Sequence, residues 1–215
     1  MNERDKAYFL DRVSLEMDQD LKAAPLNVVE SLSLACRILA REGHESGLAG
    51  QVTARGERPG TWWTLQFGYG FDEASPERMV LVDEDLKPLS GGRPSTGKAL
   101  KTIHMDSAML HGAAHLAEWP GVPVADDEGR IISGALGDAK SILLANHGLL
   151  TTGNSVEEAA YLAVFFERAA RMQLRAMAAG GFKEVKPELA AEARDFLLQP
   201  SIVRGTFAYW ARRCG

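Results

Sequence analysis

The sequence lacks the features that mark several large classes of protein. It has only two cysteines in 215 residues, Cys36 and Cys214, too few for a disulfide framework, so we expect both to be free thiols. It has no apolar run long enough to span a bilayer, and residues 1–20 are too charged to hold the apolar core of a signal peptide. We therefore expect a cytoplasmic protein that does not enter the membrane.

An excess of positive charge is also absent. The 24 lysines and arginines are outnumbered by 29 aspartates and glutamates, which gives a formal net charge of -5. A nucleic-acid-binding protein uses a basic face for most of its affinity, so DNA and RNA are not expected as partners. The Gly-rich residues 91–98 lack the spacing of a phosphate loop, and no Gly-x-Ser-x-Gly motif is present.

What is present describes one globular domain. Hydrophobic residues make up 46% of the chain, charged residues 25%, and there are 21 glycines to form turns. We predict a single domain over residues 1–215, in which residues 1–26 form an N-terminal arm or surface helix and residues 187–215 form a helical tail.

Local patterns predict the elements within this domain. Asn27 is a suitable N-cap for a helix that ends at Gly43, and Ser155 with Glu158 forms a capping-box pattern for a helix that reaches about Ala179. Segments with a strand pattern, and one further segment interpreted as helical, follow from the distribution of apolar residues. The predicted strands lie near residues 50–55, 61–67, 79–82 and 141–145, and the further helix covers residues 107–116.

Three histidines have residue patterns compatible with chemistry. His147 follows the buried strand 141–145 and lies between an asparagine and a glycine, where α/β folds present reactive groups. The alternative is a structural histidine hydrogen-bonded under the Thr151–Thr152 turn. His111 and His115 are four residues apart, so one helix would direct both at a shared ion, and an exposed amphipathic face is the alternative.

Three stretches together resemble the class II aldolase/adducin family. They are residues 34–44 running into Gly-Gln-Val-Thr-Ala-Arg at 50–55, then Trp-Pro-Gly-Val-Pro at 119–123, and then residues 141–150 with Ser-Val-Glu-Glu-Ala-Ala at 155–160. The resemblance implies an α/β fold of three layers, in which a central, mainly antiparallel sheet is flanked by helices. It also implies a homo-oligomer, expected to be a tetramer, that acts on a small-molecule substrate.

The same resemblance implies a divalent metal, zinc first, with manganese, iron or cobalt as alternatives. The family binds it through a His-x-His pair, a histidine in an Asn-His-Gly-like motif, which His147 matches, and a nearby glutamate that is an acid/base or a fourth ligand. The metal acts as a Lewis acid that polarises a carbonyl or enediolate oxygen beside the reacting carbon–carbon bond.

This sequence contains no His-x-His, and the family normally has about thirty more residues at the junction of Thr96 and Gly97, a helix followed by a strand. The acid/base glutamate is expected in the same segment. Either the natural protein has a segment here that the 215-residue sequence omits, or the protein truly lacks it and cannot assemble the usual metal site. We favour the omission, because deleting a helix and an interior strand would expose core surface and leave sheet edges unpaired.

The resemblance also indicates a substrate pocket. Sugar-phosphate aldolases of the family hold phosphate with a Thr-Gly pair, whereas the matching residues here are Phe67 and Gly68, which favours a non-phosphorylated substrate. We predict that the pocket is lined by Gln51, Gly68, Ser95 and His104. The predicted function is a metal-dependent carbon–carbon lyase, either an aldolase or a decarboxylase. The alternatives are a non-catalytic adducin-like binding or assembly module and a metal-dependent epimerase or oxygenase.

Overall fold

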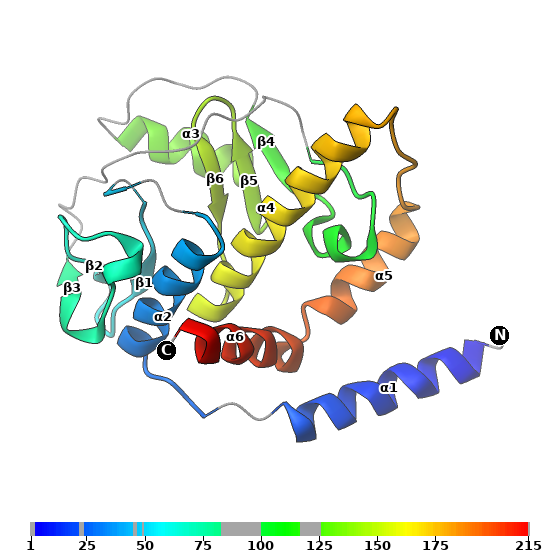
Figure 1. Ribbon diagram of the computed structural model, residues 1–215, viewed down its shortest axis with the longest axis horizontal. Helices are drawn as coiled ribbons and strands as arrows, with labels where there is room; N and C mark the ends of the chain where they lie inside the picture. The colour runs from blue at the N-terminus through cyan, green and yellow to red at the C-terminus, as the bar shows by residue number, and fades with distance from the viewer. Residues whose placement is uncertain are drawn as a thin grey trace.

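The computed structural model describes residues 3–21, 24–44, 47–48, 50–82, 100–116 and 126–214 of the chain. Three helices form its centre. They are α2 (Val28–Arg41), α4 (Val156–Ala178) and α6 (Pro200–Cys214), and their mutually packed faces supply most of the buried apolar side chains. Figure 1 shows α4 running diagonally across the molecule, with α2 and α6 at its lower end.

Helix α2 begins as its sequence predicts. The Asn27 side chain accepts a hydrogen bond from the backbone N–H of Glu30, and the Glu30 carboxylate accepts one from the backbone N–H of Asn27. This reciprocal capping box satisfies two backbone donors that the first turn would otherwise leave unpaired. Leu32, Cys36 and Leu39 then follow one buried face.

The strands form two separate sheets of three strands each in the described residues. The first contains β1 (Thr53–Arg55), β2 (Trp62–Leu65) and β3 (Met79–Val82), paired antiparallel in chain order. The second contains β4 (Ala114–Leu116), β5 (Ser141–Leu144) and β6 (Gly148–Thr151), in which β4 and β5 are parallel and β5 and β6 are antiparallel. The prediction of an α/β fold with mainly antiparallel strands and flanking helices is confirmed, and the described strands form two sheets where one central sheet was predicted.

Helices α3 and α4 pack on the second sheet, and further helices complete the fold. Helix α3 (Asp126–Leu136) packs on β4 and β5, α4 packs on β6, and α5 (Pro187–Leu197) packs on the 3₁₀ helix η3 (Met105–Leu110). Two shorter 3₁₀ helices, η1 (Phe71–Glu73) and η2 (Pro76–Arg78), connect β2 to β3.

The aromatic residues of the C-terminal tail dock on the core. The ring of Trp210 in α6 lies 6.0 Å from that of Tyr161 and 5.9 Å from that of Phe165, both in α4. Phe207 is also buried, so α6 contributes a continuous apolar face to the core.

Helix α1 (Glu3–Asp20) projects away from this body, with the N-terminus at its far end (Figure 1). In its C-terminal part Met17 packs on the core cluster. None of the helices that the structure describes is both long enough and apolar enough to cross a lipid bilayer.

Candidate functional site

His147 lies at the closed end of the β5–β6 hairpin. Its backbone N–H donates to the carbonyl of Leu144 at 3.2 Å, which closes a four-residue turn. Asn146, the third residue of that turn, has φ of 56° and is the one non-glycine residue with positive φ among those described. Asparagine tolerates this left-handed conformation better than most residues, which explains why Asn146 precedes the histidine.

The turn is held on the neighbouring strand as well. The backbone N–H of Ala145 donates to the carbonyl of Leu116 at the end of β4, at 3.0 Å. Because β4 and β5 are parallel, their carboxyl ends meet at the same edge of the sheet, and this edge carries the Asn146–His147 turn. The prediction that strand 141–145 delivers His147 to its C-terminal end is confirmed.

The helix predicted for residues 107–116 is wrong. Residues 105–110 form the short 3₁₀ helix η3, Gly112 has φ of 83°, and the chain then enters β4. His111 therefore caps η3, where its Nδ1 lies 3.4 Å from the hydroxyl of Thr102, while His115 lies in β4 opposite Leu143. One helix does not direct both histidines at an ion, so that candidate site loses its geometric basis.

His104 begins η3. Its backbone N–H donates to the hydroxyl of Ser107, and that hydroxyl donates to the His104 carbonyl at 2.7 Å. The imidazole Nε2 of His104 is buried and has no hydrogen-bond partner among the described residues. The ring thus carries an unsatisfied polar atom, which is compatible with the predicted role in substrate binding.

Gln51 and Gly68 belong to the other sheet. Gln51 is exposed and precedes β1, and Gly68 is an exposed turn residue after β2 with φ of 99°. Ser95 and the expected glutamate near Thr96 lie outside the described residues. The structure therefore places His104 and His147 near the second sheet and Gln51 and Gly68 near the first.

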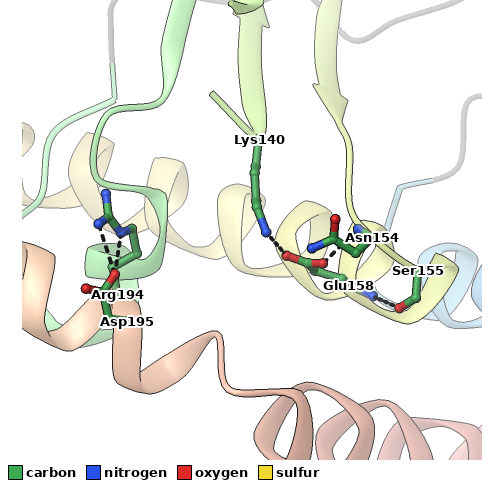
Figure 2. A network of polar contacts seen from close by, with 6 residues as sticks. All are labelled: Lys140, Asn154, Ser155, Glu158, Arg194 and Asp195. Carbon is green, nitrogen blue, oxygen red and sulfur yellow. Dashed lines mark hydrogen bonds and ion pairs between the residues drawn. The ribbon is translucent and has the colours of Figure 1, made fainter. Parts of the chain in front are cut away.

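A buried carboxylate, Glu158, holds the open end of the hairpin, and sequence reasoning missed this role. The predicted capping box at the start of α4 is half formed, since the Ser155 hydroxyl accepts from the Glu158 N–H at 3.2 Å. The Glu158 carboxylate does not return to Ser155. Instead it accepts hydrogen bonds from the ammonium of Lys140 and the backbone N–H of Asn154 (Figure 2). A lysine just before a strand gives no local signal for such a long-range contact.

The described residues do not form a metal site on their own. His147 is chemically suited to be one ligand, but nowhere in the described ranges do three or more histidine, cysteine, aspartate or glutamate residues come together so that they could hold an ion. Multidentate protein sites need about three or more such ligands. The remaining ligands would have to come from outside the described residues.

The marked pKa shifts lie in the helical core. Burial raises the pKa of the Cys36 thiol to about 12. Burial, with a smaller contribution from the negative charge of Asp106, also raises the pKa of the Tyr161 hydroxyl. Both groups stay protonated at neutral pH, so neither is suited to act as a nucleophile or a base.

The mixed α/β fold, the mainly antiparallel sheets and the histidine in an Asn-His-Gly turn define the class of protein. The chain belongs to the Class II Aldolase and Adducin N-terminal domain family, whose sequence profile matches residues 30–115 and 95–174.

Two relatives illustrate the kinds of enzyme to which the sequence is similar. The chain is 29% identical to 4-hydroxy-3-prenylphenylpyruvate oxygenase/4-hydroxy-3-prenylbenzoate synthase of Streptomyces roseochromogenus subsp. oscitans over 196 positions, which cover 74% of this chain and 71% of that protein. It is 28% identical to 3,4-dihydroxyphthalate decarboxylase of Arthrobacter keyseri over 214 positions, covering 77% and 86%.

Solved structures show the same fold. L-fuculose 1-phosphate aldolase from Glaciozyma antarctica PI12 superposes with a TM-score of 0.76 at 23% identity, covering 90% of this chain and 94% of that one. An aldolase II superfamily protein from Pseudomonas syringae gives 0.73 at 22% identity, with the same coverage.

The alignments to the relatives are longer than the matched part of this chain. Since 74% of 215 residues is about 159, about 37 of the 196 positions aligned with the Streptomyces protein carry no residue of this chain. By the same comparison, about 48 of the 214 positions aligned with the Arthrobacter protein carry none. The relatives therefore contain internal sequence that has no counterpart here.

Proposed function

We propose that this protein is a metal-dependent carbon–carbon lyase whose metal is held in part by His147. The observation that carries the proposal is the Asn146–His147 turn, which presents an imidazole at the carboxyl edge of β4 and β5 in a chain of the class II aldolase family. Zinc is the metal we expect, and manganese, iron and cobalt also accept imidazole ligands.

Decarboxylation of a hydroxylated aromatic acid is the reaction we favour. Both relatives described above are named for aromatic carboxylic acids or their immediate precursors. Phe67 supports a non-phosphorylated substrate, because it has no hydroxyl to donate to a phosphate, and its side chain is 70% exposed beside the turn at Gly68. Gln51, Gly68, Ser95 and His104 remain the residues proposed to line the substrate pocket.

We further propose that the natural protein carries an additional segment at the junction of Thr96 and Gly97 that supplies the other metal ligands and the acid/base glutamate. Two observations support this. About 37 positions of the Streptomyces alignment are unfilled, and the family profile matches in two pieces that meet within residues 95–115.

Mass and metal content test the proposal. We expect the protein expressed from its natural gene to have an intact mass well above 23.4 kDa and to bind close to one divalent metal ion per chain. The His147→Gln variant should lose most of this metal, whereas the matched control His111→Gln, at the cap of η3, should keep it. Carbon dioxide release from hydroxybenzoates and dihydroxyphthalates, compared with cleavage of sugar phosphates, then tests the substrate class.

One observation favours a non-catalytic binding module as the second candidate, namely the lack of a three-ligand cluster in the described residues. A natural protein of 23.4 kDa that binds no metal would establish this candidate and overturn the lyase.

A further inference from the structure

The Glu158 carboxylate is buried where α4 packs against the second sheet. The residue is 8% exposed, at the third position of α4. A buried carboxylate is costly unless charged or polar groups satisfy it. The Lys140 ammonium approaches one oxygen, and the N–H of Asn154 donates to the other at 2.8 Å (Figure 2). Both oxygens are therefore used.

Lys140 and Asn154 flank the open end of the β5–β6 hairpin, one before β5 and the other after β6. Lys140 immediately precedes β5, and its carbonyl accepts from the N–H of Thr152, just after β6, at 2.8 Å. The hydroxyl of Thr151 donates to the carbonyl of Ala159 in α4 at 2.9 Å. The first turn of α4 therefore holds both strands.

Gly153 shows how closely the hairpin approaches the helix. A Cβ atom added there would lie 2.8 Å from the backbone nitrogen of Ala159 and 2.9 Å from the Cβ of Glu158. Such distances are well inside van der Waals contact, so the spacing between hairpin and helix is tightly fixed.

The helix end is itself anchored. The Ser31 hydroxyl in α2 donates to the carboxylate of Glu157 in the first turn of α4, at 2.6 Å. A continuous set of contacts thus runs from the core helix α2 through α4 and Glu158 to Lys140. From there the ladder of β5 and β6, in register from Ser141 opposite Thr151 to Leu144 opposite Gly148, leads to the turn.

We propose that Lys140 and Glu158 are positioning residues that fix the Asn146–His147 turn relative to the helical core. The ladder is short and its register is defined, so a displacement at its open end is transmitted to its closed end. In this role the pair fixes the position of the turn and does not contact the reacting atoms. The inference rests on the proposed function for the role of His147, and the geometric part stands without it.

The first experiment measures amide hydrogen exchange across residues 144–148 in the natural full-length protein without metal. Lys140→Met removes the charge that faces Glu158, and because the Lys140 side chain is 41% exposed the variant should fold. We expect exchange in the turn to accelerate by about tenfold, since the turn then opens locally at lower cost. Glu158→Gln should give the same direction, and Lys140→Arg should restore exchange to within about twofold of the wild type.

The Arg168–Glu42 ion pair is the matched control. It also joins two elements, α4 and the end of α2, and its side chains are 45% and 21% exposed. Arg168→Met should lower the melting temperature about as much as Lys140→Met and leave exchange in residues 144–148 unchanged. If residues 144–148 exchanged at the same rate in Lys140→Met and Arg168→Met, the positioning role would be overturned. Lys140 and Glu158 would then be ordinary stabilising residues.

The second experiment separates this inference from the proposed function. In the holoprotein we expect Lys140→Met to weaken zinc affinity by about tenfold and to lower kcat with little change in KM, because the pair acts on geometry. If Lys140→Met exchanged faster in residues 144–148 but bound zinc with unchanged affinity, the pair would have no role in metal binding. If His147→Gln retains full metal content, the proposed function fails, and the exchange experiment still decides whether the pair positions the turn.

Discussion

The helical core and the β5–β6 hairpin differ in how their residues are buried. Helices α2 and α4 each contain at least eight buried residues; in the hairpin β5 is buried at three of its four residues, whereas every residue of β6 is only partly buried. Apolar packing holds the helical core and also buries much of β5, and hydrogen bonds and one ion pair additionally tie the open end of the hairpin to α4. Stability and presentation of His147 thus depend on different kinds of interaction, and substitutions should separate them.

The largest effect is expected in the core. Phe166 in α4 is 1% exposed, and Phe166→Ala removes a buried ring and leaves a cavity. We expect the free energy of unfolding to fall by about 3–5 kcal/mol. Urea denaturation followed by circular dichroism measures this. A loss below about 1 kcal/mol would show that α4 does not carry the core packing described here.

A smaller effect is expected where the hairpin meets the core. Gly153→Ala places a methyl group 2.8 Å from the backbone nitrogen of Ala159, so the hairpin must shift. We expect a loss of about 1–3 kcal/mol in unfolding free energy. Gly134→Ala in α3 is the control, because open space surrounds an added Cβ there, and it should stabilise the protein by about 0.5–1 kcal/mol. Equal effects at the two positions would contradict the close approach.

The Cys36 thiol predicts how core stability depends on pH. The pKa of the thiol is raised to about 12 in the folded protein, whereas in the unfolded protein it is about 8.5. Stability from this group is complete below that unfolded pKa and is lost as pH rises toward 12, because only the unfolded state releases the proton. Between pH 8 and 10, we expect the wild type to lose about 1–2 kcal/mol more than Cys36→Ala in denaturant unfolding. Parallel losses in both proteins would contradict the shift.

The smallest effect is expected on the exposed face of α4. Arg171 pairs with Glu167 at 3.2 Å, one turn earlier, and the two side chains are 52% and 34% exposed. Solvent screens such pairs, so Arg171→Ala should change the unfolding free energy by less than about 0.5 kcal/mol. A thermal melt at low and high salt measures this. A loss above about 1 kcal/mol would place this face among the stabilising surfaces.

The sequence predicts best what local interactions decide. The start of α2 at Asn27 and the bounds of β3 follow from capping and from an uninterrupted apolar run, and the structure confirms both. Residues 107–116 show the limit. Their apolar pattern suits a helix, but Gly112 adopts positive φ and the parallel pairing with β5 draws the next residues into β4. Strand pairing depends on residues distant in sequence, and local periodicity does not report it.

The candidate site is predictable to a similar extent. The position of His147 after a buried strand could be read from the chain, because the strand and the turn are local. The role of Glu158 could not, since its pattern with Ser155 indicates a capping box, while a lysine eighteen residues earlier takes the carboxylate instead.

The backbone conformation of Asn146 limits which residues can replace it beside His147. A library that varies the residues around the imidazole to alter substrate preference has little freedom at position 146, where β-branched and bulky side chains would strain the chain by about 1–3 kcal/mol. Glycine is the replacement that the geometry accepts most readily. Productive diversity should therefore be sought on the strands and helices that surround the turn.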